Sequence, residues 1–217
     1  MIVAGIDVGL TGGVAVLDTQ LPSTATGCML PLMQPAVVGK AKGDNREVDA
    51  RGLWALLEGV DLFVVERVWT RPTGPETDGG ARPGGAKSKG GRRQGGVSNA
   101  KLMTLYGEGR GFLKMLVETQ RRLSQPPTPY LEPAPQTWKN LVLAGAEKDK
   151  PAAIQFAKEH YPTVTLTPPP KRKPQHGIAD AVCLAHFGLL VVKSPTPKLL
   201  SRFPHLKEHL SRLQSLL

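Results

Sequence analysis

The stretch GIDVGLTGGVAVL, residues 5–17, decides the fold because it places a glycine-rich turn between two apolar runs. The runs IVAGI and GVAVL predict two strands, and residues 7–12 between them predict the turn of a hairpin. Residues 25–32 predict a third strand, and residues 129–132 predict a short one further along the chain. The bounded apolar run LFVV, residues 62–65, is typical of a buried parallel strand. The chain therefore begins with antiparallel strands and continues with parallel ones.

Apolar residues at helical spacing predict the remaining elements. Helices are expected over residues 48–57, 98–123 with Ser98 as N-cap, 135–143, 149–161 and 178–192, and one amphipathic helix within the tail 194–217. Strands followed by alternating helices and strands indicate the α/β class. We expect a mixed five-stranded sheet flanked by helices, in the order of a ribonuclease H-like fold. One domain over residues 1–192 and a helical tail over 193–217 are predicted.

Composition excludes several classes of protein. With 217 residues the chain fits one domain, and only Cys28 and Cys183 occur, so a disulfide scaffold is excluded and reduced core thiols are expected. No apolar run approaches the ~18–20 residues that span a bilayer, and a strand rather than a signal peptide is expected at the N-terminus. The net charge of +10 suggests a polyanionic partner, with nucleic acid as the first candidate.

Residues 71–96 are rich in glycine, proline, lysine and arginine and cannot bury a core. We expect a disordered surface loop there. A flexible basic arm that orders on a phosphate backbone is the functional alternative, and it is compatible with the first interpretation.

Three acidic residues stand at the ends of predicted elements. Asp7 ends the first strand, just before glycines that let a ligand approach the backbone, and Glu66 ends the strand over residues 62–65. Asp180 lies in the first turn of the apolar helix near the C-terminus. A lone carboxylate of this kind is usually only solvated. Three of them in a basic chain indicate a site for hard divalent cations that hold a phosphate.

These segments resemble a known family. The motifs GIDVGLTGGVAVL, VVERV and HGIADAVCLAHFG are similar to the metal-binding motifs of RuvC-type Holliday-junction resolvases. The segments PQTWKN at 135–140, KRK at 171–173 and VGK at 38–40 followed by VD at 48–49 are similar to the chloroplast branch of that family. The resemblance covers roughly residues 1–190 and leaves out the glycine-rich loop and the tail.

The resemblance implies a structure-selective endodeoxyribonuclease that hydrolyses phosphodiesters with two Mg²⁺ or Mn²⁺ ions. Asp7, Glu66 and Asp180 fall on the family's metal-binding carboxylates, with Asp7 shared by both ions. His176 stands where the plant enzymes carry an acidic residue, so it either binds a metal, orients or deprotonates the water, or is a neutral structural histidine. Lys139 matches a lysine that approaches the active site and would offset charge on the phosphate.

The resemblance also implies the partners and the location. A homodimer, formed through the helix over residues 98–123, would make paired symmetric nicks in a four-way DNA junction; alternatively that helix is fully buried within one chain. Localisation in the chloroplast nucleoid is expected, with a transit peptide outside this sequence, or otherwise in bacterial or phage cytoplasm. The residues expected to bind DNA are Val38, Gly39, Lys40, Lys42, Arg46, Lys139, Lys171, Arg172 and Lys173.

Three alternatives stay open from the residues alone. An actin-like or sugar-kinase ATPase shares the Asp-x-Gly hairpin but needs two such domains, for which 217 residues are too few. A non-catalytic junction-binding protein would keep the fold without the chemistry. Another nuclease of the same fold would act on RNA–DNA hybrids or flaps.

Overall fold

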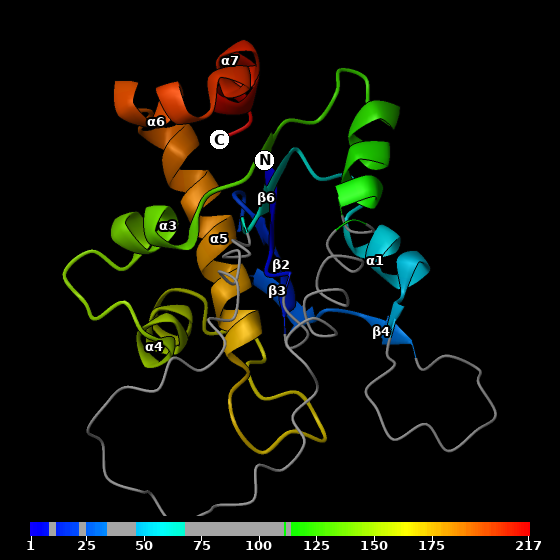
Figure 1. Cartoon of the computed structure of the whole chain (residues 1–217), viewed down its shortest axis with the longest axis vertical. Coiled ribbons are helices and arrows are strands. Elements are labelled where there is room, and N and C mark those ends of the chain that lie inside the picture. Colours follow the sequence, from blue (N-terminus) through cyan, green and yellow to red (C-terminus); the bar gives the residue numbers. More distant parts are fainter. Residues whose placement is uncertain (9–11, 22–24, 34–46, 68–110, 112–113) are drawn as a thin grey trace, which may run out of the picture.

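The chain forms one mixed sheet of five strands (Figure 1). The computed structural model describes residues 1–8, 12–21, 25–33, 47–67, 111 and 114–217. The strands of the main sheet are β1 (Ile2–Ile6), β2 (Gly13–Asp18), β3 (Ala25–Met29), β6 (Leu62–Val65) and β7 (Tyr130–Leu131). Their order is β3-β2-β1-β6-β7, in which β2 pairs antiparallel with both neighbours while β1, β6 and β7 run parallel. This order confirms the predicted ribonuclease H-like arrangement.

Helices cover both faces of this sheet. Beyond residues 111 and 114–123, which are helical, the described helices are α1 (Ala50–Leu56), α3 (Pro135–Val142), α4 (Lys150–His160), α5 (His176–Lys193), α6 (Pro197–Arg202), the 3₁₀ helix η1 (Pro204–Leu206) and α7 (Lys207–Ser215). A two-stranded sheet joins β4 (Leu32–Met33) to β5 (Glu47–Val48). The helices expected at 48–57, 135–143, 149–161 and 178–192 are thus confirmed, and Ser98 lies outside the described residues.

Alternation along β1 and β6 separates two cores. Val3, Leu62 and Val64 belong to the core that includes α5, whereas Ile6 and Val65 belong to the core that includes α1 and residues of the 114–123 helix. Successive strand residues point to opposite faces of a sheet. Figure 1 shows the same layering, with α3, α4 and α5 on one side of the strands and α1 on the other.

Helix α5 is the central helix of the fold, and it is apolar on nearly every side. It has 18 residues, and of the described helices it alone is long and apolar enough to span a membrane, so the prediction that no apolar run approaches this length is wrong for α5. Of this helix, 72% is buried inside the protein. Two glycines let it lie directly on the sheet. A Cβ at Gly5 would stand 2.1 Å from the carbonyl oxygen of Ala181, and one at Gly13 would stand 2.6 Å from that of Gly177. The glycines after Asp7 were expected to let a ligand approach the backbone. At Gly13 it is the backbone of α5 that approaches instead.

The tail 194–217 holds more than the one amphipathic helix predicted within it. The tail contains α6, η1 and α7, because Pro204 has no N–H to continue a helix and the preceding Phe203 is not helical. Phe203, Leu206 and Leu213 are buried in the same core as α5. The N-terminal ammonium donates a hydrogen bond of 2.8 Å to the carbonyl of Leu216, so the tail closes over the start of β1.

His186 makes stability depend on pH. This half-buried side chain of α5 has its Nδ1 atom 2.7 Å from the hydroxyl oxygen of Tyr161. Both cysteines of the chain, Cys28 and Cys183, are free thiols, as expected. Burial, aided by the charges of His160 and Lys193, lowers the pKa of His186 to about 4. Between pH 6.5 and 4 the unfolded chain therefore binds a proton at this position that the folded chain does not, so stability falls as the pH falls through this window.

We expect the protonation of His186 to lower the free energy of unfolding by about 1 to 3 kcal/mol at pH 4 relative to pH 7, after allowing for solvent screening. Urea denaturation of the wild type and of His186→Gln at both pH values measures it. The wild type should lose more stability on acidification than the variant. Equal losses in the two proteins would contradict the assignment.

Candidate functional site

Asp7 and Glu66 leave the sheet side by side. Ile6 on β1 pairs with Val65 on β6 in parallel register, and the Glu66 amide donates to the carbonyl of Ile6 at 3.0 Å. Ile6 and Val65 both face the α1 side, so the next residue on each strand faces α5. Neighbouring strands are about 4.8 Å apart, which places the two carboxylates at adjacent positions on the α5 face.

Asp180 reaches this same end of the sheet on α5. Gly177, one turn before it, forms a bridge with Gly12, and Ala181, next to it, lies against Gly5. Asp180 is therefore held over the C-terminal ends of β1 and β6. Its charge acts on Glu66 and raises the pKa of that carboxyl. The three acidic residues predicted from element ends are thus gathered at one edge of one face.

Burial is the main reason that both Glu66 and Asp180 have raised pKa values. For Glu66 a hydrogen bond from Trp138 opposes the rise, Asp180 adds to it and Lys139 opposes it. For Asp180 the charges of Lys139 and Lys150 oppose the rise. Two partly desolvated carboxylates that repel one another are stabilised by any cation placed between them.

Two lysines from different helices act on these carboxylates. Lys139 is on α3, with its Nζ 5.2 Å from the centroid of the Trp138 ring. Lys150 is the first residue of α4, where Asp149 caps the helix through the Ala152 amide. Lys139 was predicted from the resemblance, whereas Lys150 was missed. It begins the helix expected over residues 149–161, and only the packing of α4 on α5 brings it near Asp180.

His176 begins α5, one turn before Asp180. It is half-buried, and desolvation together with the charge of Lys150 lowers its pKa. The imidazole is therefore neutral at neutral pH, the form that binds metals and accepts protons. A role for His176 as ligand or base stays a prediction.

The donor chemistry of the site fits Mg²⁺ or Mn²⁺, which prefer carboxylate oxygens. In the part of the chain that the structure describes, however, no group of three or more His, Cys, Asp or Glu side chains is arranged to hold a metal ion. The backbone places Asp7 and Glu66 at the ends of adjacent strands, and the charge of Asp180 acts on Glu66, but these side chains do not form a metal-binding arrangement among the described residues. Metal binding by these residues and by His176 stays a prediction.

The expected DNA-binding residues fall into two groups. Lys171, Arg172 and Lys173 are exposed in the connector that leads into α5, close in sequence to the acidic edge. Lys139 is described on α3, next to the acidic edge. Five lie outside the described residues, as does the segment 71–96: Val38, Gly39, Lys40, Lys42 and Arg46.

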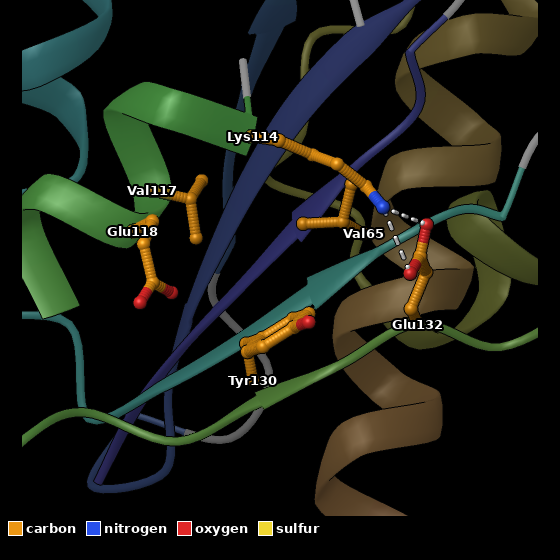
Figure 2. A pocket seen from close by; sticks show the side chains of 6 residues that line it. All are labelled: Val65, Lys114, Val117, Glu118, Tyr130 and Glu132. Carbon is orange, nitrogen blue, oxygen red and sulfur yellow. Dashed lines mark hydrogen bonds and ion pairs between the residues drawn. The ribbon is translucent and has the colours of Figure 1, made fainter. Parts of the chain in front are cut away.

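A small pocket, which the sequence did not predict, lies on the α1 side of the sheet, opposite the face of Asp7, Glu66 and Asp180 (Figure 2). Lys114 and Glu132 form an ion pair of 2.9 Å at its edge. The pocket holds about 220 Å³ and is lined by Val65, Lys114, Val117, Glu118, Tyr130 and Glu132. Because Val65 faces away from α5, this pocket is separated from the acidic edge by the sheet itself.

Comparisons with known proteins found similarity only in the overall structure of the chain, not in its sequence. No family model matches the sequence, and no curated protein matches it. Among solved structures, the chain is similar to Thermus thermophilus RuvC in complex with Holliday junction substrate, with 15% identity, a TM-score of 0.49 and coverage of 90% of this chain and 97% of that one. A second RuvC structure from Thermus thermophilus gives 15% identity, a TM-score of 0.47 and coverage of 89% and 96%. The chemistry assigned to the site rests on this chain's own residues.

Proposed function

We propose that the protein is a metal-dependent endodeoxyribonuclease that resolves four-way DNA junctions by paired symmetric nicks. The observation that carries the proposal is the meeting of Asp7, Glu66 and Asp180 at one edge of a ribonuclease H-like sheet. Cationic groups flank these acids, and the net charge of +10 favours a nucleic-acid partner. The resemblance of the sequence motifs supplies the junction as the substrate.

In this mechanism Asp7, Glu66 and Asp180 would hold the divalent ions, two per site. When bound, the ions supply Lewis-acid activation of water and stabilise the leaving oxygen. Lys139 and Lys150 attract the phosphate and offset the charge that develops on it. Neutral His176 is able to accept a proton from the attacking water. The exposed basic connector, residues 171–173, would hold a duplex arm through its phosphates.

The deciding experiment compares four substrates: a synthetic four-way junction, its matching duplex, a flap and an RNA–DNA hybrid, each with and without Mg²⁺. Symmetric paired nicks in the junction alone, dependent on Mg²⁺, are the expected result. Cleavage of the hybrid or flap would instead assign another nuclease of the same fold. Tight junction binding without any nick would assign a non-catalytic binding protein.

A two-fold dimer would deliver the paired nicks, because its two sites are related as the junction strands are. The helix over residues 114–123 offers a face for it. Met115 is 59% exposed and Leu123 is 68% exposed, and their spacing of eight residues places them on one side of the helix. These two exposed apolar side chains on one side of the helix are what supports an interface there.

We expect the double variant Met115→Glu/Leu123→Glu to dissociate the dimer at least ten-fold more readily and to replace paired nicks with single uncoordinated ones. Sedimentation velocity and a supercoiled cruciform substrate measure the two effects. Leu21→Glu, at an equally exposed leucine in a turn, is the control and should remain dimeric. A wild-type monomer, or an unchanged double variant, would refute this interface.

The resemblance of the motifs also leads us to place this activity in the chloroplast nucleoid, or otherwise in bacterial or phage cytoplasm. Imaging of a fluorescent fusion of the natural gene product together with a DNA stain tests the location. Signal that coincides with plastid DNA is expected.

A further inference from the structure

Trp138 connects the hydrophobic core to the acidic edge. Its side chain is fully buried on α3, within the core formed around α5. Its one polar atom, Nε1, donates a hydrogen bond of 2.9 Å to Oε1 of Glu66. A buried indole N–H needs an acceptor, and here the acceptor is a carboxylate of the candidate site. A rigid core side chain thus fixes one oxygen of Glu66.

The same ring also lies under a cation. The Nζ of Lys139 is 5.2 Å from the centroid of the indole, within the range of a cation–π contact. Arg202 on α6 donates to Thr137 at 3.0 Å, so the tail helps to hold α3 in place. One buried indole therefore contacts an acid at its edge and a base over its face.

We infer that Trp138 is a positioning residue that presets Glu66 and Lys139 for a divalent cation and its phosphate. This inference rests on the proposed function and extends it. Donors behind a metal-binding carboxylate fix its orientation, and their loss typically weakens metal binding by roughly 10- to 100-fold. Trp138 is such a donor behind Glu66, and because its side chain is fully buried its N–H cannot turn to water instead.

The first test is Mn²⁺ binding, measured by electron paramagnetic resonance of the free ion. Trp138→Phe keeps an aromatic ring and removes the N–H, and we expect its affinity for Mn²⁺ to fall roughly 10- to 100-fold. Trp54→Phe is the matched control, because Trp54 packs in the core on the other face of the sheet. Its affinity should match that of the wild type. Circular dichroism establishes that both variants are folded.

The second test needs no folded variant at position 138. Titration of ¹⁵N-labelled wild type with Mg²⁺ is followed through the indole N–H resonances, and the resonances of Trp54 and Trp69 are assigned from their phenylalanine variants. The remaining resonance, that of Trp138, should shift as Mg²⁺ is added and level off when the metal site is saturated. The resonance of Trp54 should stay unchanged. Core packing alone would not couple Trp138 to the ion.

The outcomes separate this inference from the proposed function. Wild type that binds neither Mn²⁺ nor Mg²⁺ would refute the metal-dependent nuclease and the positioning role together. Wild type that binds Mn²⁺ and cuts junctions, with Trp138→Phe equal to it in affinity or with a static Trp138 resonance, would refute only the positioning role. Weaker Mn²⁺ binding by a folded Trp138→Phe together with a moving resonance supports it.

Discussion

Asp7→Asn should abolish junction cleavage while leaving junction binding intact. Asp7 lies at the end of β1, beside Glu66 on β6, and its amide is held at 2.9 Å from the carbonyl of Gly13. The amide side chain keeps the shape of the carboxylate and removes its charge. As the proposed shared ligand of both ions, Asp7 is the residue whose loss affects the metals most. We expect the nicking rate to fall roughly 1,000-fold or more, which is about 4 kcal/mol of transition-state stabilisation.

Single-turnover nicking at saturating Mg²⁺ measures the rate, and gel-shift titration with the same junction measures binding. Asp18→Asn is the control, because Asp18 ends β2 at the opposite end of the hairpin, paired with Ile2. Its carboxylate accepts a local hydrogen bond from the Gln20 amide. It should cut at the wild-type rate. If Asp7→Asn also cut normally, Asp7 would have no part in catalysis.

The strands and the acidic edge could be predicted because both follow from short-range pattern. A hairpin in which apolar runs flank glycines forms β1 and β2, and a four-residue apolar run forms β6. Neighbouring parallel strands end at the same edge of a sheet, and because β1 pairs directly with β6, the residues that follow them lie side by side. The adjacent positions of Asp7 and Glu66 could therefore be predicted from the sequence, while their role stays a prediction.

The surroundings of the acids were not predictable in this way. Trp138 reaches Glu66 from 72 residues away, and Lys150 reaches Asp180 through the packing of α4 on α5. No periodicity in the sequence encodes either contact, since each depends on how two helices sit on the sheet. The prediction for the tail was incomplete for a local reason, because Pro204 interrupts the helix despite the amphipathic pattern on either side of it.

Gly5→Ala should destabilise the fold strongly, because the added methyl group would meet backbone atoms rather than a side chain. Its Cβ would stand 2.1 Å from the carbonyl oxygen of Ala181 and 2.5 Å from the amide nitrogen of Ala185. Both atoms belong to the backbone of α5, which cannot rotate away as a side chain would. Either β1 or the whole helix must move, and overpacking of this kind costs about 3 kcal/mol or more.

For a chain of this size that loss lowers the melting temperature by roughly 6–12 °C, which differential scanning calorimetry measures. Gly111→Ala is the matched control, since a Cβ there meets no atom of the described residues within 4 Å and Gly111 is helical, so its stability should stay equal or rise slightly. A shifted α5 would also carry Asp180 away from Asp7 and Glu66. Gly5→Ala should therefore lose Mn²⁺ affinity even at temperatures where it is fully folded, whereas Gly111→Ala should not. A Gly5→Ala protein that melts with the wild type would mean that α5 does not lie directly on β1, and the route by which Asp180 joins the site would fail with it.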